Sequence, residues 1–296
     1  MVGASLCGDS TPVNTPDLLT TSQKIESLLV THNHRGMATA GASLEPGYLL
    51  RAARLIQASA GRVYILTGFP VGDTFETDGP AGAMSLYRLC ERLGSDPIIL
   101  SDPAVTTALA AEFRCHTLTD TSAAGARQSA TALFKQAPPV LVISIERPGA
   151  AQDGRCYNMA GDTISAHSAY SEAYLELANC PTIAIGDGGN EIGMGNLMGA
   201  LSHFDIHPAV STCEELVVAD VSNWAAYALC LITDWLNGAR YCLADDVQAD
   251  LEHLVSQGAV DGVTGHATAT EDGFAEQSAQ RLIHDIHTIL AQDTVT

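Results

Sequence analysis

The chain has 296 residues, of which 46% are hydrophobic, and it carries 34 acidic against 14 basic side chains, for a net charge of −20. This length and apolar content suit one large α/β domain. The negative charge argues against nucleic acid and anionic membranes as partners. The eight cysteines are scattered without zinc-type spacing, which favours free thiols in a reducing compartment.

The N-terminal region is predicted to be a flexible tail over residues 1–22, followed by a single α/β catalytic domain over residues 23–296. The first twenty residues contain Asp9 and Asp17, no Lys or Arg, and no apolar block, so they resemble neither a secretory signal nor a transit peptide. We therefore expect a cytoplasmic protein. The most apolar later segment, residues 224–236, is too short to span a bilayer and predicts a buried helix.

Helical spacing is expected over residues 24–30 and 47–59, and short apolar runs then alternate with helical segments. The runs are residues 63–66, 98–100, 113–118, 140–145, 182–185 and 216–219, and the helices between them include residues 81–93, 104–112 and 123–136. This alternation predicts a doubly wound, three-layer fold, in which helices cover both faces of a mainly parallel sheet. The long polar loop over residues 146–168 is the candidate for a lid or insertion.

The loops that follow the strands are the candidate site, because ligands of an open parallel sheet bind beyond the carboxyl ends of its strands. Pro80 fits a first helical position, which leaves free amides near Gly79. Ser222 has the character of a helix cap. Arg147 and Arg155 also lie in these loops, where they could equally be solvated surface residues.

The most informative loop, residues 186–195, has the sequence G-D-G-G-N-E-I-G-M-G and directly follows an apolar run. Glu191 replaces the third glycine of the dinucleotide fingerprint, so we expect no nucleotide cofactor. Asp187 and Glu191 would share a face if a helix starts here, and two carboxylates would attract a divalent cation or an amine. The predicted metal ligands are Asp187 and Glu191, with help from Glu76 or Asp78.

Six segments together resemble the D-glutamate cyclase family, whose members include the C-terminal catalytic part of a mitochondrial enzyme and many microbial proteins. The resemblance spans about residues 25–290, and it describes this chain as a stand-alone microbial member without the further N-terminal domain of eukaryotic relatives. Arg35-Gly36-Met37 also resembles an early family motif. The six segments are Thr67-Gly68-Phe69-Pro70, Glu76-Thr77-Asp78-Gly79-Pro80-Ala81-Gly82-Ala83, Asp153-Gly154-Arg155-Cys156-Tyr157-Asn158-Met159, Gly186-Asp187-Gly188-Gly189-Asn190-Glu191-Ile192-Gly193-Met194-Gly195, Val221-Ser222-Asn223-Trp224 and Gly258-Ala259-Val260-Asp261-Gly262-Val263-Thr264-Gly265.

The resemblance implies a hydro-lyase that removes water from D-glutamate to give 5-oxo-D-proline. It implies a bound Mg²⁺ or Mn²⁺ that polarises the γ-carboxylate, and a carboxylate that moves a proton from the amine to the departing oxygen. The candidates for the catalytic carboxylates are Glu191, Asp187 and Asp78. The candidates for substrate binding are Thr67, Gly79, Arg147, Arg155, Asn158, Gly188, Asn190, Ser222 and Asn223.

Other functions stay open at this point. A sensor of the same fold would bind an amino acid or metabolite without turning it over, and a metal-dependent enzyme could act on another small carboxylate. The absence of a phosphate-binding lysine motif counts against phosphoryl transfer. The expected partner is a small amino-acid substrate, and a homo-oligomer is compatible with the sequence.

Overall fold

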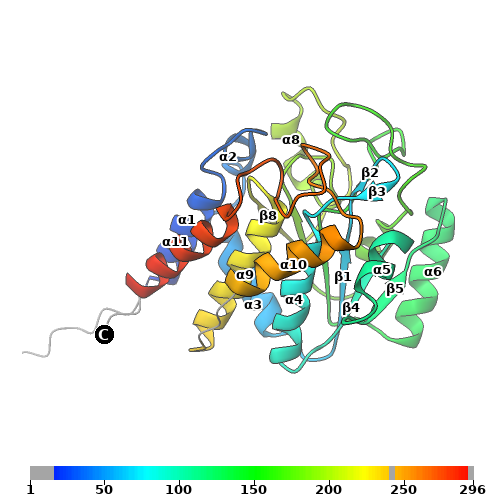
Figure 1. Ribbon diagram of the computed structural model, residues 1–296. Coiled ribbons are helices and arrows are strands. Elements are labelled where there is room, and N and C mark those ends of the chain that lie inside the picture. Colours follow the sequence, from blue (N-terminus) through cyan, green and yellow to red (C-terminus); the bar gives the residue numbers. More distant parts are fainter. Residues whose placement is uncertain (1–16, 240–243, 293–296) are drawn as a thin grey trace, which may run out of the picture.

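A parallel six-stranded sheet forms the centre of the protein (Figure 1). The computed structural model describes residues 17–239 and 244–292. All six predicted apolar runs form strands, and a short antiparallel hairpin was not predicted. The strands of the large sheet are β1 (Arg62–Thr67), β4 (Asp96–Ser101), β5 (Cys115–Thr117), β6 (Leu141–Ile145), β7 (Thr182–Gly186) and β8 (Glu215–Val218), and those of the hairpin are β2 (Pro70–Val71) and β3 (Thr74–Phe75).

The strand order β5-β4-β1-β6-β7-β8 places the two halves of the sheet side by side at β1 and β6. These strands pair in parallel, with Thr67 opposite Ile145 at their carboxyl ends. The chain leaves β1 toward one edge of the sheet and leaves β6 toward the other. Doubly wound folds bind their ligands in the crevice that opens at such a reversal of strand order.

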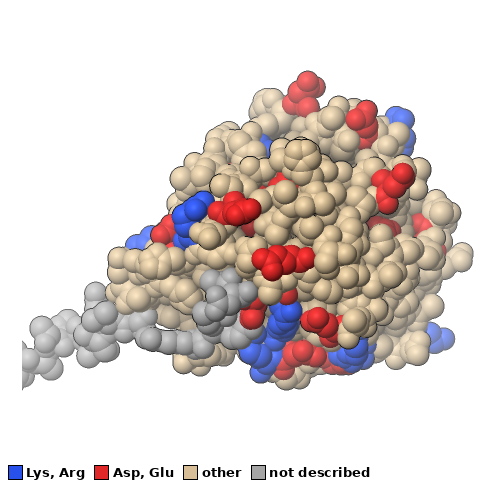
Figure 2. Space-filling model, viewed as in Figure 1, with Lys and Arg blue, Asp and Glu red and all other residues tan. Residues whose placement is uncertain are grey.

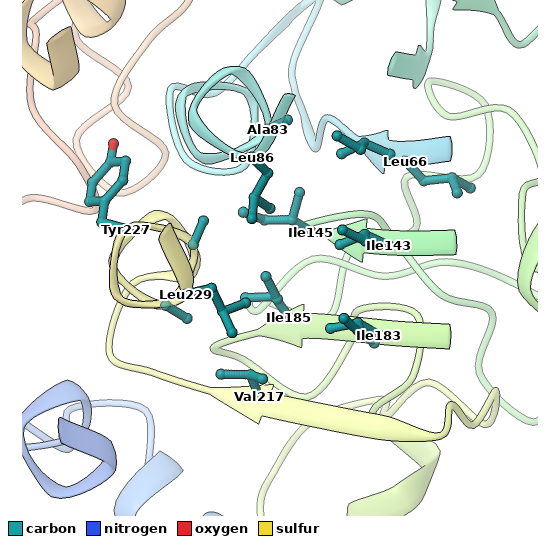
Figure 3. Close-up of a cluster of buried hydrophobic side chains, with 14 of the residues drawn as sticks. Leu66, Ala83, Leu86, Ile143, Ile145, Ile183, Ile185, Val217, Tyr227 and Leu229 are labelled. Carbon is teal, nitrogen blue, oxygen red and sulfur yellow. The ribbon is translucent and has the colours of Figure 1, made fainter. Parts of the chain in front are cut away.

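One face of the sheet packs against helices α4 (Pro80–Arg92) and α9 (Ser222–Leu236). Ile145, Ile185 and Val217 share a row across β6, β7 and β8 and point toward these helices (Figure 3). The strands are apolar in nearly every position because both faces of a parallel sheet are covered. Four helices pack around α4 and α9: α1 (Leu18–Leu29), α3 (Tyr48–Gln57), α10 (Ala244–Ser256) and α11 (Ser278–Gln292).

The opposite face is covered by α6 (Ala123–Gln136) and α7 (Ala173–Glu176). The ring of Tyr64 on β1 stacks on Phe134 of α6, with 5.6 Å between the ring centroids. Helices therefore lie on both faces, and the predicted three-layer fold is confirmed. The remaining short helices are α2 (Met37–Gly41), α5 (Pro103–Leu109), the 3-10 helix η1 (Gly195–Leu197) and α8 (Met198–Leu201).

Several predicted boundaries differ from the structure. Helix α1 begins at Leu18 with Asp17 as its N-cap, so residues 18–22, which were assigned to a flexible tail, are helical, and two of their polar side chains are buried. Residues 1–16 of that predicted tail lie outside the described part of the chain. The glycine loop does not start a helix, since η1 begins only at Gly195. Among the described residues, none of the helices is both long enough and apolar enough to cross a membrane.

Candidate functional site: a buried acidic centre

Six carboxylates and one guanidinium meet beyond the carboxyl ends of the central strands, and we call this group the acidic centre. All six acidic residues are buried, with at most 7% of any of them exposed. Figure 2 shows other acidic side chains scattered over the visible surface among Lys and Arg. The acidic centre is therefore distinct from the general acidity of the surface. Its members are Glu76, Asp78, Glu146, Asp187, Glu191 and Asp272, together with Arg35.

Asp78 and Asn223 join the first turns of α4 and α9. Asp78 accepts hydrogen bonds from the backbone amides of Ser222 at 2.9 Å and Asn223 at 2.7 Å, which open α9. The Asn223 side-chain oxygen accepts from the amides of Gly79 at 2.8 Å and Gly82 at 2.7 Å, which open α4. Each helix is thus capped by a residue from the other segment. The two helix N-termini favour a negative charge on Asp78, but burial and the charges of Asp272 and Glu271 outweigh them and raise its pKa well above the usual range.

Gly79 brings the start of α4 against the crevice between β1 and β6. Its φ of +91° belongs to the region that favours glycine. A β-carbon at this position would lie 2.6 Å from Cβ of Glu146 and 2.9 Å from Oγ1 of Thr67. A larger residue therefore cannot be accommodated. The hydroxyl of Thr67 is buried and makes no hydrogen bond to the part of the chain that the structure describes.

Glu146 follows β6 directly and lies in the acidic centre, although it was not among the predicted site residues. Its φ of +43° is unusual for a residue with a side chain, and such backbone strain is concentrated at functional sites. The carboxylate accepts a hydrogen bond of 2.6 Å from the Ser222 hydroxyl. One feature of the sequence indicates that Glu146 belongs to the site, which is its position immediately after strand β6.

The glycine loop is organised by its own carboxylate. Glu191 accepts hydrogen bonds of 2.8 Å from the amides of Gly188 and Gly189, one to each oxygen. The Gly188 amide, a candidate for substrate binding, is therefore already used within the loop. Asn190 donates from its side chain to the carbonyl of Tyr157 at 2.7 Å, while its own side-chain oxygen is buried and has no partner among the residues described by the structure.

Replacing Glu191 with Gln is expected to lower the free energy of unfolding by about 1 to 3 kcal/mol, because Gln has one acceptor oxygen for two buried amides. Turnover should stay within a few fold of the unaltered protein. Chemical denaturation and steady-state kinetics would check both values, with the exposed Glu45→Gln as the matched control. A loss of 100-fold or more in kcat at an unchanged melting temperature would instead establish the predicted catalytic role of Glu191.

Arg35 connects the glycine loop to the C-terminal region. Its Nη1 donates to Oδ1 of Asp187 at 2.5 Å and to Oδ2 of Asp272 at 2.6 Å. The other oxygen of Asp187, Oδ2, is buried and accepts no hydrogen bond from residues 17–239 or 244–292. Asp272 has a φ of +52° and closes a loop in which Asp261 binds several backbone amides. Neither Arg35 nor Asp272 was predicted as a site residue, although Arg35 lay in a recognised motif.

The electrostatics of the acidic centre favour a bound cation. Burial raises the pKa of Glu76, Glu146 and Asp272 well above the usual range, and the neighbouring carboxylates add to this effect. Burial also raises the pKa of Asp187 to about 7, although the charge of Arg35 opposes the shift. One guanidinium cannot balance this many carboxylates, so the centre must either hold protons or bind a cation.

Three of these carboxylates could hold a metal ion. Asp78, Glu146 and Asp187 each offer an oxygen within 4.8 Å of the oxygens of the other two. Hard oxygen ligands suit Mg²⁺, Mn²⁺ or Ca²⁺, and a cation would satisfy the unpaired oxygen of Asp187. The structure thus brings two predicted metal ligands, Asp78 and Asp187, together with Glu146. Glu191 directs its oxygens to the glycine loop, and Glu76 lies outside the group of three.

The two arginines predicted to grip the substrate lie elsewhere. Arg147 is fully buried and donates to Asp102, to the Ser171 hydroxyl and to backbone carbonyls, which braces the loops behind β1 and β6. Arg155 is 58% exposed and pairs with Asp153. The remaining candidate, Asn158, forms a turn with Asp162. Neither Arg155 nor Asn158 contacts the acidic centre.

Comparison with known proteins assigns the family. Residues 25–287 match the family described as D-glutamate cyclase-like, C-terminal. The chain belongs to this family. The segments that carry the acidic centre, from Arg35 to Asp272, all lie within the matched range.

Two similar proteins illustrate how far the likeness extends. Human mitochondrial D-glutamate cyclase is 32% identical over 219 residues, which are 62% of this chain and 35% of that protein. The chain therefore spans about a third of the length of this relative. Among solved structures, an exopolyphosphatase-related protein from Bacteroides fragilis is similar over 84% of this chain and 57% of its own, with a TM-score of 0.40 and 8% identity.

Proposed function

We propose that this D-glutamate cyclase-like protein is a metal-dependent hydro-lyase that converts D-glutamate into 5-oxo-D-proline and water. The observation that carries the proposal is the buried acidic centre, which lies at the reversal of strand order and within the range matched to the family. Its clustered carboxylates offer both cation ligands and groups that can exchange protons.

The reaction defines what the site must supply. The substrate nitrogen forms a bond to the carbon of the γ-carboxylate, and one oxygen of that carboxylate leaves as water. Starting from the ammonium form, the nitrogen gives up two protons and the departing oxygen receives two. The protein must therefore move protons between nitrogen and oxygen and hold the chain of the substrate in its ring-closing conformation.

Asp78, Glu146 and Asp187 are the residues that would hold Mn²⁺ or Mg²⁺. When bound, such a cation makes a carboxylate more electrophilic by acting as a Lewis acid. Two of these carboxylates are positioned by the first turn of α9, because the Ser222 amide donates to Asp78 and the Ser222 hydroxyl donates to Glu146. The Thr67 hydroxyl at the end of β1 is sealed from solvent and has no hydrogen-bond partner among the described residues, so it lines the centre without being open to a substrate.

Glu76 is the best candidate for the proton-transfer group. Its carboxylate accepts no hydrogen bond from the described residues, in contrast to those of Asp78 and Glu191, and its oxygens are not sealed from solvent. Burial and the charges of Asp272 and Asp78 raise its pKa well above the usual range. A raised pKa favours the protonated form, which is the form that can donate to a departing oxygen.

The proposal is tested by incubating the purified protein with D-glutamate and Mn²⁺ and measuring 5-oxoproline by chiral mass-spectrometric analysis. We expect the product from D-glutamate, a loss of at least about 100-fold after dialysis against EDTA, and recovery on adding Mn²⁺ or Mg²⁺. L-Glutamate is the matched comparison for enantiomer preference. Binding of D-glutamate without turnover would favour a sensor, and no response to either enantiomer would point to another small carboxylate.

A further inference from the structure

Arg35 donates hydrogen bonds to the described residues from only one of its side-chain nitrogens. Nη1 serves both Asp187 and Asp272, whereas Nε and Nη2 make no hydrogen bond to the described residues. Neither nitrogen is among the buried polar atoms that lack a partner, so both remain open to solvent. The Arg35 side chain is 17% exposed, compared with 1% for Asp187 and 2% for Asp272. The guanidinium thus presents an unused edge at the mouth of the acidic centre.

The backbone around Arg35 fixes the direction of this side chain. Asp220, itself buried, accepts hydrogen bonds from the amides of His32 at 2.7 Å and Asn33 at 2.8 Å. Gly36 turns the chain with a φ of +78° directly above the ring of Phe204. A guanidinium held by its backbone at one end and by two carboxylates at the other loses little freedom when a ligand binds.

We propose that Arg35 binds the α-carboxylate of the substrate through Nε and Nη2 and thereby selects ligands in which this carboxylate is free and charged. The inference rests on the proposed function and identifies the group in the acidic centre that recognises a negative charge. The paired donors of a guanidinium match the two oxygens of a carboxylate. An anionic substrate is repelled by the surrounding carboxylates, so a cation with free donors is the contact that offsets this repulsion.

Other described arginines do not offer the same contact. Arg147 directs all of its nitrogens to protein acceptors, and Arg155 pairs with Asp153 on the surface. The amides of Gly79, Gly188 and Gly189 are likewise taken by side-chain oxygens. Among the groups considered, Arg35 is therefore the one that can bind a carboxylate at the acidic centre.

The experiment uses two cyclised probes, the proposed product 5-oxo-D-proline and its primary amide, in which a neutral amide of similar size replaces the charged α-carboxylate. Calorimetry on the Mn²⁺-loaded protein should show a preference of roughly 10- to 100-fold for the carboxylate. The R35Q variant should reduce this preference to within about threefold, because the neutral side chain no longer distinguishes the probes. Arg127→Gln, which alters an exposed arginine paired with Glu176, is the matched control and should keep the full preference.

The outcomes separate this inference from the proposed function. If the unaltered protein forms 5-oxoproline and R35Q keeps the full preference, the inference fails while the function stands. If the unaltered protein neither forms product nor binds either probe, the proposed function fails and the inference falls with it. Should R35Q not fold, Arg35→Lys keeps the charge but loses the paired donors. We then expect the preference to fall several-fold, and an unchanged preference would overturn the inference.

Discussion

Replacing Asp187 with Asn is expected to abolish stoichiometric binding of a divalent cation and to lower kcat for 5-oxoproline formation by at least about 10³-fold. Asp187 contributes one oxygen to the group of three potential ligands, and its Oδ2 finds no hydrogen-bond partner among the described residues. Asn keeps an acceptor for Arg35 but removes the negative charge that attracts the cation. A calorimetric titration with Mn²⁺ would measure the loss of metal binding independently of activity.

The exposed Asp205→Asn is the matched control for Asp187, and it should leave both metal binding and kcat unchanged. Activity that survives in Asp187→Asn together with one bound metal per chain would place the cation elsewhere. Activity in the unaltered protein that resists EDTA would instead assign these carboxylates to proton transfer or to amine binding.

The same variant should change how stability depends on pH. Burial raises the pKa of Asp187 to about 7 in the folded protein. Protonation of Asp187 therefore contributes its full share to the free energy of unfolding below about pH 4, and this contribution is lost as the pH rises through 7. In the metal-free protein we expect Asp187 to make unfolding easier by about 2 to 4 kcal/mol between pH 4 and pH 8. Asp187→Asn should remove this share of the pH dependence, while Glu76, Glu146 and Asp272, whose pKa values are also raised, keep the remainder. Added Mn²⁺ should restore stability at pH 8 in the unaltered protein only.

Replacing Glu76 with Gln is expected to lower kcat by about 10² to 10⁴, the usual contribution of a general acid or base. Gln keeps the size of the side chain but cannot exchange a proton. Because Glu76 lies outside the group of three ligands, Mn²⁺ binding should change little. Steady-state kinetics measured over a range of pH would check the effect. The change in kcat with pH that reflects titration of Glu76 should be absent in the variant.

Glu45→Gln, on the exposed surface, is the corresponding control for Glu76. If Glu76→Gln retains more than about a tenth of the activity, proton transfer belongs to another carboxylate of the acidic centre. Asp272 would be the next residue to change, since it contacts Arg35 and its pKa is also raised well above the usual range by burial.

The strands were predictable because a strand covered on both faces must be apolar in almost every position, as in residues 141–145. Their order was not predictable, because parallel pairing joins segments with no local signal in the sequence. Asp78 and Asp187 could be found because each follows a predicted strand or opens a helix. The role of Arg147 was misjudged, since sequence alone does not distinguish a buried arginine from one that faces a ligand.

The residues that sequence reasoning missed share one property. Arg35 and Asp272 are separated by 237 positions, and they meet only because the N- and C-terminal segments fold over the same edge of the sheet. Asp272 lies in an irregular loop whose shape depends on Asp261 and its backbone hydrogen bonds. No periodic pattern marks such a segment, so its contribution to the acidic centre required the three-dimensional structure.

The shared capping of α4 and α9 extends to the loops that complete the acidic centre. Asp78 and Asn223 tie the two helix starts together. The side chain of Asn223 also donates to Glu271 at 2.9 Å, and this residue directly precedes Asp272. A change at Asn223 would therefore disturb both helix starts and the loop that holds Asp272 against Arg35, so the geometry of the whole centre depends on one amide side chain.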